Sequence, residues 1–98
     1  MSSFFDITAS DTPVLVDFFA DWCAPCKTMS PILKEVKDSL GDKIKVLKVD
    51  VDKNQRLATA LNIQGIPTLV LYKNSEMLWR QSGVVLKNDI VSKINEYL

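Results

Sequence analysis

The 98-residue chain contains no histidine, and its 12 lysine and arginine residues balance 12 aspartate and glutamate residues. The absence of histidine removes the commonest general base and the commonest metal ligand among side chains. A net charge of zero provides no basic surface of the kind that binds nucleic acid or anionic lipid. We therefore expect no metal and no nucleic acid or membrane partner.

The sequence also lacks a long apolar run, since no stretch approaches the roughly 18 residues that a membrane-spanning helix needs. Residues 1–12 show no basic segment followed by an apolar core, which is the pattern of a secretory signal. We therefore expect a cytoplasmic location, in which cysteines are normally reduced. The length and the 47% hydrophobic content are typical of a single globular domain over residues 1–98, and we expect a monomer.

Apolar periodicity predicts an alternation of strands and helices. The predicted strands are 14–19, 44–51, 69–72 and 77–81, and the predicted helices are 24–40, 54–61 and 87–98. Strand–helix–strand order implies a parallel pair with a right-handed crossover, and the four-residue turn 73–76 implies an antiparallel hairpin. The expected fold class is α/β, with one mixed sheet between two layers of helices.

Cys23 and Cys26 are the only cysteines and lie three residues apart, as Cys-Ala-Pro-Cys. Cys23 follows the first predicted strand and stands at the start of a helix, where unpaired N–H groups and the helix dipole favour an anion. We therefore expect its pKa to be lowered. Cys26 lies one turn further on the same face and can attack Cys23 when Cys23 holds a mixed disulfide. Such a pair exchanges two electrons with a substrate disulfide without a cofactor.

Three other interpretations of the pair are weaker. A structural disulfide that closes so short a loop stabilises a fold little. A zinc or iron–sulfur site needs about four ligands, so two chains would have to share one. Two inert cysteines at this spacing would be a coincidence.

The segment 14–27, VLVDFFADWCAPCK, resembles the active-site segment of the thioredoxin family. The similarity covers nearly the whole chain from Pro13 onward, and its further matches are 31–33 (PIL), 48–52 (KVDVD), 65–69 (GIPTL) and Gly83. The resemblance implies a thioredoxin fold, an α/β/α sandwich. It also implies an enzyme that reduces protein disulfides by dithiol–disulfide exchange.

The resemblance assigns the roles of the individual residues. Cys23 would be the attacking thiolate and Cys26 the resolving thiol. Pro67 would be a cis proline beside the disulfide, with the backbone of Ile66 pairing with the substrate, although the sequence does not itself show the isomer. A flat apolar patch would receive partner proteins, and it would consist of Trp22, Ala24, Pro25, Ile66, Pro67, Gly83 and Val84. Thioredoxin reductase, an NADPH-linked flavoenzyme, would supply the electrons.

Asp17 stands alone as a carboxylate within an apolar strand, where burial raises the pKa of such a group. The resemblance gives it a role in proton transfer to and from Cys26, assisted by a lysine that matches Lys48. Alternation places Lys48 on the same strand face as Ile44 and Val46, where its aliphatic stem can be buried. The alternative for both residues is an ordinary place at the surface.

Several residues depart from the family pattern. Ala24 stands where the family usually has Gly, and Phe19 stands where it commonly has Trp. Ser75 replaces the usual turn Gly, and Leu86 replaces the usual Ser or Thr helix cap. Without that cap, the last helix loses about 1 kcal/mol.

The N-terminus is the largest departure, because 12 residues before Pro13 are too few for both the strand and the helix that usually open the fold. Four apolar residues favour the helix, namely Phe4, Phe5, Ile7 and Ala9. We expect no strand in residues 1–5 and a sheet of four strands with segment 44–51 at its edge. Lys45 and Lys48 would discourage that edge from pairing with another chain.

Two other functions remain as alternatives. One is a redox-inert module of the same fold that docks on partners through the patch around Trp22 and Pro67. The other is an oxidase or isomerase of an oxidising compartment, although a signal sequence is missing and the residues between the cysteines of such proteins more often include His.

Overall fold

The structure, a computed structural model, describes residues 3–98. Within this range one mixed sheet contains four strands, which are β1 (Val14–Phe19), β2 (Lys45–Asp50), β3 (Thr68–Lys73) and β4 (Glu76–Ser82). The strand order is β2-β1-β3-β4. β1 and β2 are parallel, whereas β3 is antiparallel to both β1 and β4. The predicted parallel pair, hairpin and edge position of the second strand are therefore confirmed.

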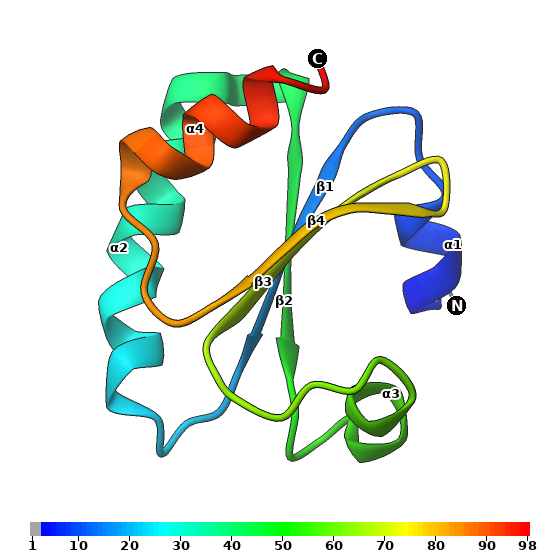
Figure 1. Cartoon of the computed structure of the whole chain (residues 1–98), viewed down its shortest axis with the longest axis vertical. Coiled ribbons are helices and arrows are strands. Elements are labelled where there is room, and N and C mark those ends of the chain that lie inside the picture. Colours follow the sequence, from blue (N-terminus) through cyan, green and yellow to red (C-terminus); the bar gives the residue numbers. More distant parts are fainter. Residues whose placement is uncertain (1–2) are drawn as a thin grey trace.

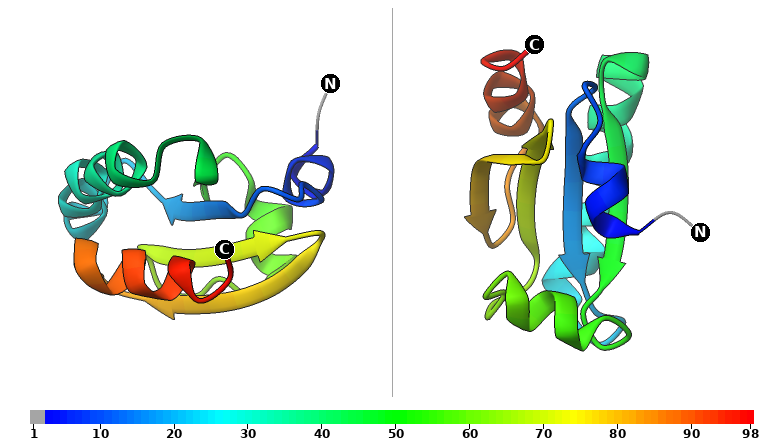
Figure 2. Two further views of the ribbon diagram at one scale, coloured as in Figure 1. Left: turned by 90° about the horizontal axis from the view of Figure 1, so that it is seen from above. Right: turned by 90° about the vertical axis from the view of Figure 1, so that its right-hand side faces the viewer.

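Helices cover both faces of the sheet (Figures 1 and 2). α2 (Ala24–Leu40) and α4 (Lys87–Asn95) pack on one face, and α1 (Phe4–Thr8) and α3 (Gln55–Ala60) pack on the other. A short 3-10 turn, η1 (Gly41–Lys43), follows α2. The three-layer α/β/α arrangement expected from the sequence is confirmed. No helix within residues 3–98 combines the length and the apolar character that crossing a membrane requires.

β1 lies at the centre of the molecule and is buried along residues 14–18. Its side chains alternate, so Leu15 packs in the core beneath α2 and α4, whereas Val16 and Phe18 pack in the core beneath α1 and α3. Asp17, two residues after Leu15, therefore faces the α2 layer. Because β1 and β2 are parallel, their carboxyl ends lie side by side, and the chain that leaves β1 there enters α2 at Cys23.

The N-terminal segment forms the predicted helix. The Ser3 side chain accepts a hydrogen bond from the Asp6 N–H and caps α1. Phe4 then packs edge-on against Tyr72, with ring centroids 5.5 Å apart. Residues 3–5 therefore form no strand, while the part of that prediction that concerns residues 1–2 lies outside the described residues.

The bounds of β1 and α2 are the predicted ones, and those of β2, α3, β3 and β4 differ from the prediction by one residue at each end. The largest difference is at α4, which ends at Asn95 instead of Leu98. Beyond Asn95, the N–H groups of Glu96 and Tyr97 bond to carbonyls three residues earlier, so the chain closes in a tighter turn. Leu86 precedes α4 without a side-chain cap, as its apolar character predicts.

Candidate functional site

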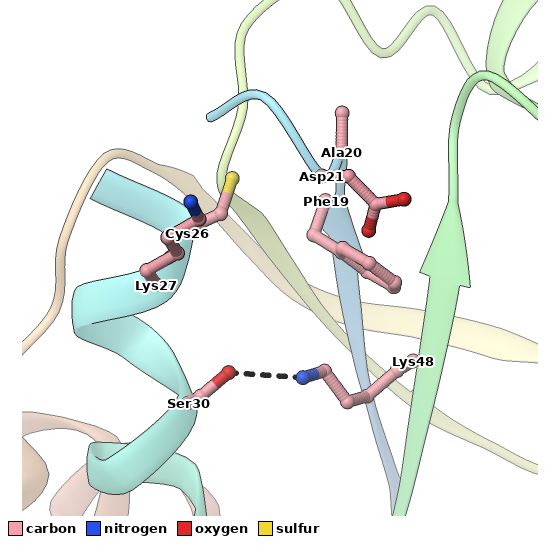
Figure 3. A pocket seen from close by; sticks show the side chains of 7 residues that line it. All are labelled: Phe19, Ala20, Asp21, Cys26, Lys27, Ser30 and Lys48. Carbon is pink, nitrogen blue, oxygen red and sulfur yellow. Dashed lines mark hydrogen bonds between the residues drawn. The ribbon is translucent and has the colours of Figure 1, made fainter. Parts of the chain in front are cut away.

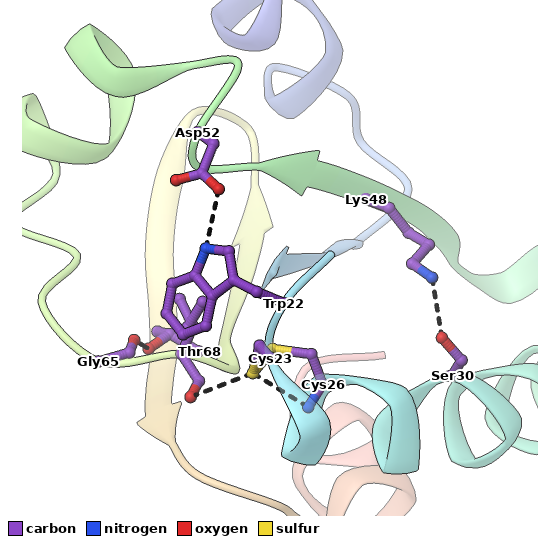
Figure 4. The surroundings of a disulfide bond; sticks show 9 residues. Trp22, Cys23, Cys26, Ser30, Lys48, Asp52, Gly65 and Thr68 are labelled. Carbon is purple, nitrogen blue, oxygen red and sulfur yellow. Dashed lines mark hydrogen bonds between the residues drawn. A yellow bond between two sulfur atoms is a disulfide. The ribbon is translucent and has the colours of Figure 1, made fainter. Parts of the chain in front are cut away.

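The two cysteines lie at the junction between β1 and α2. Cys23 is the N-cap of α2, and its N–H donates to the carbonyl of Ala20, which closes the turn after β1. Cys26 lies in the first turn of the helix and faces the end of β1 (Figure 3). The two residues are joined by a disulfide, with their Cα atoms 5.3 Å apart (Figure 4).

The start of α2 supplies a hydrogen-bond donor to Cys23. The Cys26 N–H donates to the Cys23 Sγ at 3.2 Å. Such donors stabilise a charged sulfur, and the N-terminal end of the helix dipole acts in the same direction. This geometry favours a thiolate on Cys23 when the disulfide is reduced. Each cysteine is only 3% exposed, so a reacting disulfide must approach the protein surface closely.

The loop before β3 lies against the disulfide. The Ile66–Pro67 peptide bond is cis, as the resemblance implies, and the Ile66 carbonyl oxygen lies 3.7 Å from the Cys23 Sγ. The Gly83 N–H donates to the Pro67 carbonyl at 2.8 Å, so the residue that follows β4 lies against the loop beside the disulfide.

Two hydroxyl groups hold that loop, and neither was singled out from the sequence. The Thr68 hydroxyl donates to the Gly65 carbonyl at 2.6 Å and lies 2.8 Å from the Ser82 hydroxyl. Because the Thr68 proton is already used, Ser82 is the donor in the second bond. Thr68 stands in the quoted GIPTL segment, whereas no sequence signal marks Ser82.

The predicted patch lies at the surface around the disulfide. Trp22 is 70% exposed, and its indole Nε1 donates to the Asp52 Oδ2 at 2.9 Å. Ile66 is half-buried and Pro67 is buried, whereas the other patch members are exposed, namely Ala24, Pro25, Gly83 and Val84. A core position for Trp22 is thereby excluded. Asp52 was missed as its partner, although it stands in the quoted KVDVD segment.

Asp17 is fully buried beneath α2. Within residues 3–98, neither of its carboxylate oxygens has a hydrogen-bond partner. Burial raises the pKa of Asp17 from 3.8 to about 6, and the positive charge of Lys48 acts weakly in the opposite direction. A carboxyl group with this pKa is able both to donate and to accept a proton near neutral pH.

Lys48 is the register partner of Asp17 on β2. The residue as a whole is exposed, and within residues 3–98 β2 is an edge strand of the sheet. The burial of its stem stays a prediction. The ammonium nevertheless turns inward, since it donates to the Ser30 Oγ at 3.0 Å and lies 5.0 Å from the centroid of the Phe19 ring.

A cleft of about 180 Å³ separates α2 from the ends of β1 and β2 (Figure 3). It is lined by Phe19, Ala20, Asp21, Cys26, Lys27, Ser30 and Lys48. Within residues 3–98, no three histidine, cysteine, aspartate or glutamate side chains gather as a metal site would require.

Comparison with known proteins agrees with this geometry. The family model "Thioredoxin" matches residues 2–96. The chain belongs to the thioredoxin family. A thioredoxin of Rickettsia prowazekii is 42% identical over 91 residues, which make up 93% of this chain and 87% of that protein. Thioredoxin Y, a chloroplastic protein of Oryza sativa, is 43% identical over 91% of this chain and 53% of its own length.

Solved thioredoxin structures show the same fold. A mutant thioredoxin from Halobacterium salinarum superposes with a TM-score of 0.88, and its sequence is 34% identical. The match covers 99% of this chain and 84% of the other. Family membership and the disulfide-bonded Cys23–Cys26 pair together identify a protein-disulfide oxidoreductase. A redox-inert binding module is not favoured.

Proposed function

We propose that the protein reduces disulfides in other proteins, with Cys23 as the attacking nucleophile and Cys26 as the resolving thiol. The observation that carries these roles is the position of Cys23. It caps α2, its sulfur accepts the Cys26 N–H, and it stands beside the exposed patch. Cys26 lies in the first turn of α2 and lines the cleft between α2 and the ends of β1 and β2.

The reaction proceeds in two exchanges. The Cys23 thiolate attacks one sulfur of the client disulfide, the client S–S bond breaks, and the second client sulfur leaves as a thiolate that takes up a proton. Cys26 then gives up its proton and attacks the Cys23 sulfur of the mixed disulfide. The remaining client thiolate leaves and is protonated, so two electrons have passed to the client and Cys23–Cys26 is oxidised.

Asp17 accepts the proton that Cys26 must lose in the second exchange. Its buried position beneath α2 and its pKa of about 6 support this role. Lys48, the neighbouring residue on β2, favours the ionised carboxylate by its positive charge.

The client binds as an extended segment across the patch. The backbone of Ile66 pairs with that segment, and the cis bond at Pro67 and the bond from Gly83 support this arrangement because they fix the loop beside Cys23. Trp22, Ala24, Pro25 and Val84 contribute an exposed, largely apolar surface that accepts clients of different sequence.

Thioredoxin reductase, an NADPH-linked flavoenzyme, returns the disulfide to the dithiol. Family membership supports this partner, as it supports disulfide-containing clients. The protein acts as a monomer in the cytoplasm and needs no cofactor beyond its own cysteine pair.

A trapping experiment tests the two cysteine roles. When Cys26→Ser is mixed with a disulfide-bonded model protein, a stable mixed disulfide through Cys23 should accumulate, because no resolving thiol remains. Cys23→Ser is the matched control and should give no adduct under the same conditions. If only Cys23→Ser forms the adduct, the two roles are reversed, and if neither variant does, the mechanism is wrong.

The redox potential distinguishes a reductant from an oxidant. Equilibration against glutathione, followed by Trp22 fluorescence, should give a potential at or below roughly −220 mV, the upper end of the cytosolic poise. A potential well above this value would indicate an oxidase or isomerase.

A further inference from the structure

Ser30 links the helix layer to the edge of the sheet. It lies one turn after Cys26 on α2, and its hydroxyl accepts a hydrogen bond from the Lys48 ammonium across the cleft (Figure 3). Within residues 3–98, this hydroxyl is the only hydrogen-bond acceptor of that ammonium. The ammonium also lies over the face of the Phe19 ring, which is typically a weaker contact than a hydrogen bond to a charged group.

We propose that Ser30 is a positioning residue that holds the Lys48 ammonium in the cleft and thereby controls the proton exchange between Asp17 and Cys26. The proposal rests on the proposed function, in which Asp17 takes the Cys26 proton. Ser30 touches neither the client nor the reacting sulfur atoms in this scheme and acts only through Lys48.

The chemistry of the hydroxyl suits this task. Lys48 is exposed on an edge strand, and a free lysine side chain there would extend into solvent, where water screens its charge. A carboxylate at position 30 would also hold the ammonium, but it would neutralise its field. A neutral hydroxyl holds the charge in place and leaves that field to act on Asp17.

Lys48 is the charged residue that acts most directly on the pKa of Asp17. Asp17 lies between Lys48 on β2 and Leu69 on β3, and the core under α2 and α4 beside it is apolar. The lysine charge lowers the pKa of Asp17 against the larger effect of burial. The other ionisable groups that line the cleft are Asp21, Cys26 and Lys27. Asp21 and Lys27 are exposed and of opposite charge, so their effects on Asp17 oppose each other.

The direct test is the titration of the Asp17 carboxyl by carbon-13 NMR in the oxidised protein. In Ser30→Ala, the midpoint should move upward by about 0.5 pH unit, because the freed ammonium moves into solvent. Ser30→Thr retains the hydroxyl and should leave the midpoint unchanged. Lys48→Met should raise the midpoint further, and adding Ser30→Ala to Lys48→Met should have no additional effect.

A kinetic readout follows from the same shift. Because Asp17 must be ionised to accept the Cys26 proton, the pH profile for resolution of the mixed disulfide should move upward equally in Ser30→Ala. Below the midpoint, the resolution rate should fall up to about threefold.

An unchanged Asp17 midpoint in Ser30→Ala overturns the proposal, whatever Lys48→Met does. The proposal is also overturned if Ser30→Ala shifts the Asp17 midpoint as much in the Lys48→Met background as in the unmodified protein. Ser30 would then act on Asp17 without Lys48. The proposed function fails in a different way, namely if Asp17→Asn resolves the mixed disulfide with the rate and pH profile of the unmodified protein.

Discussion

At Asp17, the burial that supports the proposed proton transfer also destabilises the folded protein. Its carboxyl is fully buried and has no hydrogen-bond partner within residues 3–98. A rise of its pKa from 3.8 to about 6 means that ionisation destabilises the folded state by roughly 3 kcal/mol. The same burial suits the proposed role, because a carboxylate with its ordinary pKa is a weak base toward the Cys26 thiol, and a raised pKa makes Asp17 a stronger one.

Asp17→Asn should therefore stabilise the protein in a pH-dependent manner. The folded-state pKa lies above the unfolded value, so the contribution of Asp17 to stability is fully present below about pH 4 and is lost as the pH rises through 6. The variant should be more stable than the unmodified protein by roughly 3 kcal/mol at pH 8, and the gain should shrink toward pH 4.

Urea unfolding of both oxidised proteins at pH 4 and pH 8 measures this difference. Asp38→Asn, at an exposed position of α2, controls for the loss of one surface carboxylate. A gain for Asp17→Asn that is equal at both pH values would contradict the proposed cause, since it would not depend on ionisation.

Asp52 should matter because it orients Trp22 in the patch. Asp52→Ala removes the acceptor of the indole bond, and a bond of this kind contributes about 0.5–1.5 kcal/mol. The apparent KM for a client protein should rise about two- to tenfold.

Time-resolved fluorescence anisotropy in a Trp79→Phe background should show faster motion of Trp22. Asp52→Asn retains an acceptor and should preserve both properties, whereas an unchanged anisotropy in Asp52→Ala would show that other contacts hold the ring.

Sequence patterns reveal site residues whose surroundings are local. The environments of Cys23 and Asp17 follow from a helix start and an apolar strand, both of which are visible within a few positions. Ser30 and Asp52 act on partners 18 and 30 residues away, respectively, and serine and aspartate are common on exposed surfaces. Only the packing of the layers shows which of many such residues meets a partner.

At the scale of elements, the hairpin between β3 and β4 has no glycine in its loop, although such loops favour one. Lys73 and Glu76 are register partners, so Asn74 and Ser75 form a two-residue loop, and their φ angles are +53° and +68°. Such loops favour glycine because a side chain at positive φ crowds the backbone. The loop also holds α1, since the Ser75 N–H donates to the Thr8 carbonyl.

Ser75→Gly should stabilise the protein by about 0.5–1 kcal/mol, because glycine relieves the strain and keeps the backbone donor. The matched control is Ser92→Gly in α4, an exposed helical position where the same change should destabilise by about 0.5 kcal/mol. Midpoints of urea unfolding report both effects. A loss of stability in Ser75→Gly would mean that the serine side chain contributes more than the strain removes.

At the scale of the whole molecule, β2 and β4 are the two edge strands of the sheet within residues 3–98, and β2 is the edge that carries lysines. The N–H groups of Lys45 and Val51 donate to β1 or to residues at its ends, so the alternating backbone groups of Val46 and Lys48 point away from the sheet. A net charge of zero provides no general repulsion between copies. Protection of this edge therefore depends on charges carried by the strand itself. The parallel pair, the hairpin and the edge position of β2 could be predicted, because crossover and hairpin rules leave few topologies. The inward turn of Lys48 could not, because it depends on the packing of α2.

Lys45→Val should make the protein associate with itself through this edge. Lys45 is exposed, and a second chain that paired with β2 would have to desolvate its ammonium. Valine removes that cost and fits a pleated strand better, so antiparallel pairing with another copy becomes more favourable. Sedimentation velocity should show dimers or larger species at a several-fold lower protein concentration than for the unmodified protein. Lys34→Val removes the same charge and exposes an equal apolar side chain on a helix, which cannot pair as a strand, and it should stay monomeric over the same range. If the two variants associate equally, added surface hydrophobicity explains the effect and Lys45 does not protect the edge.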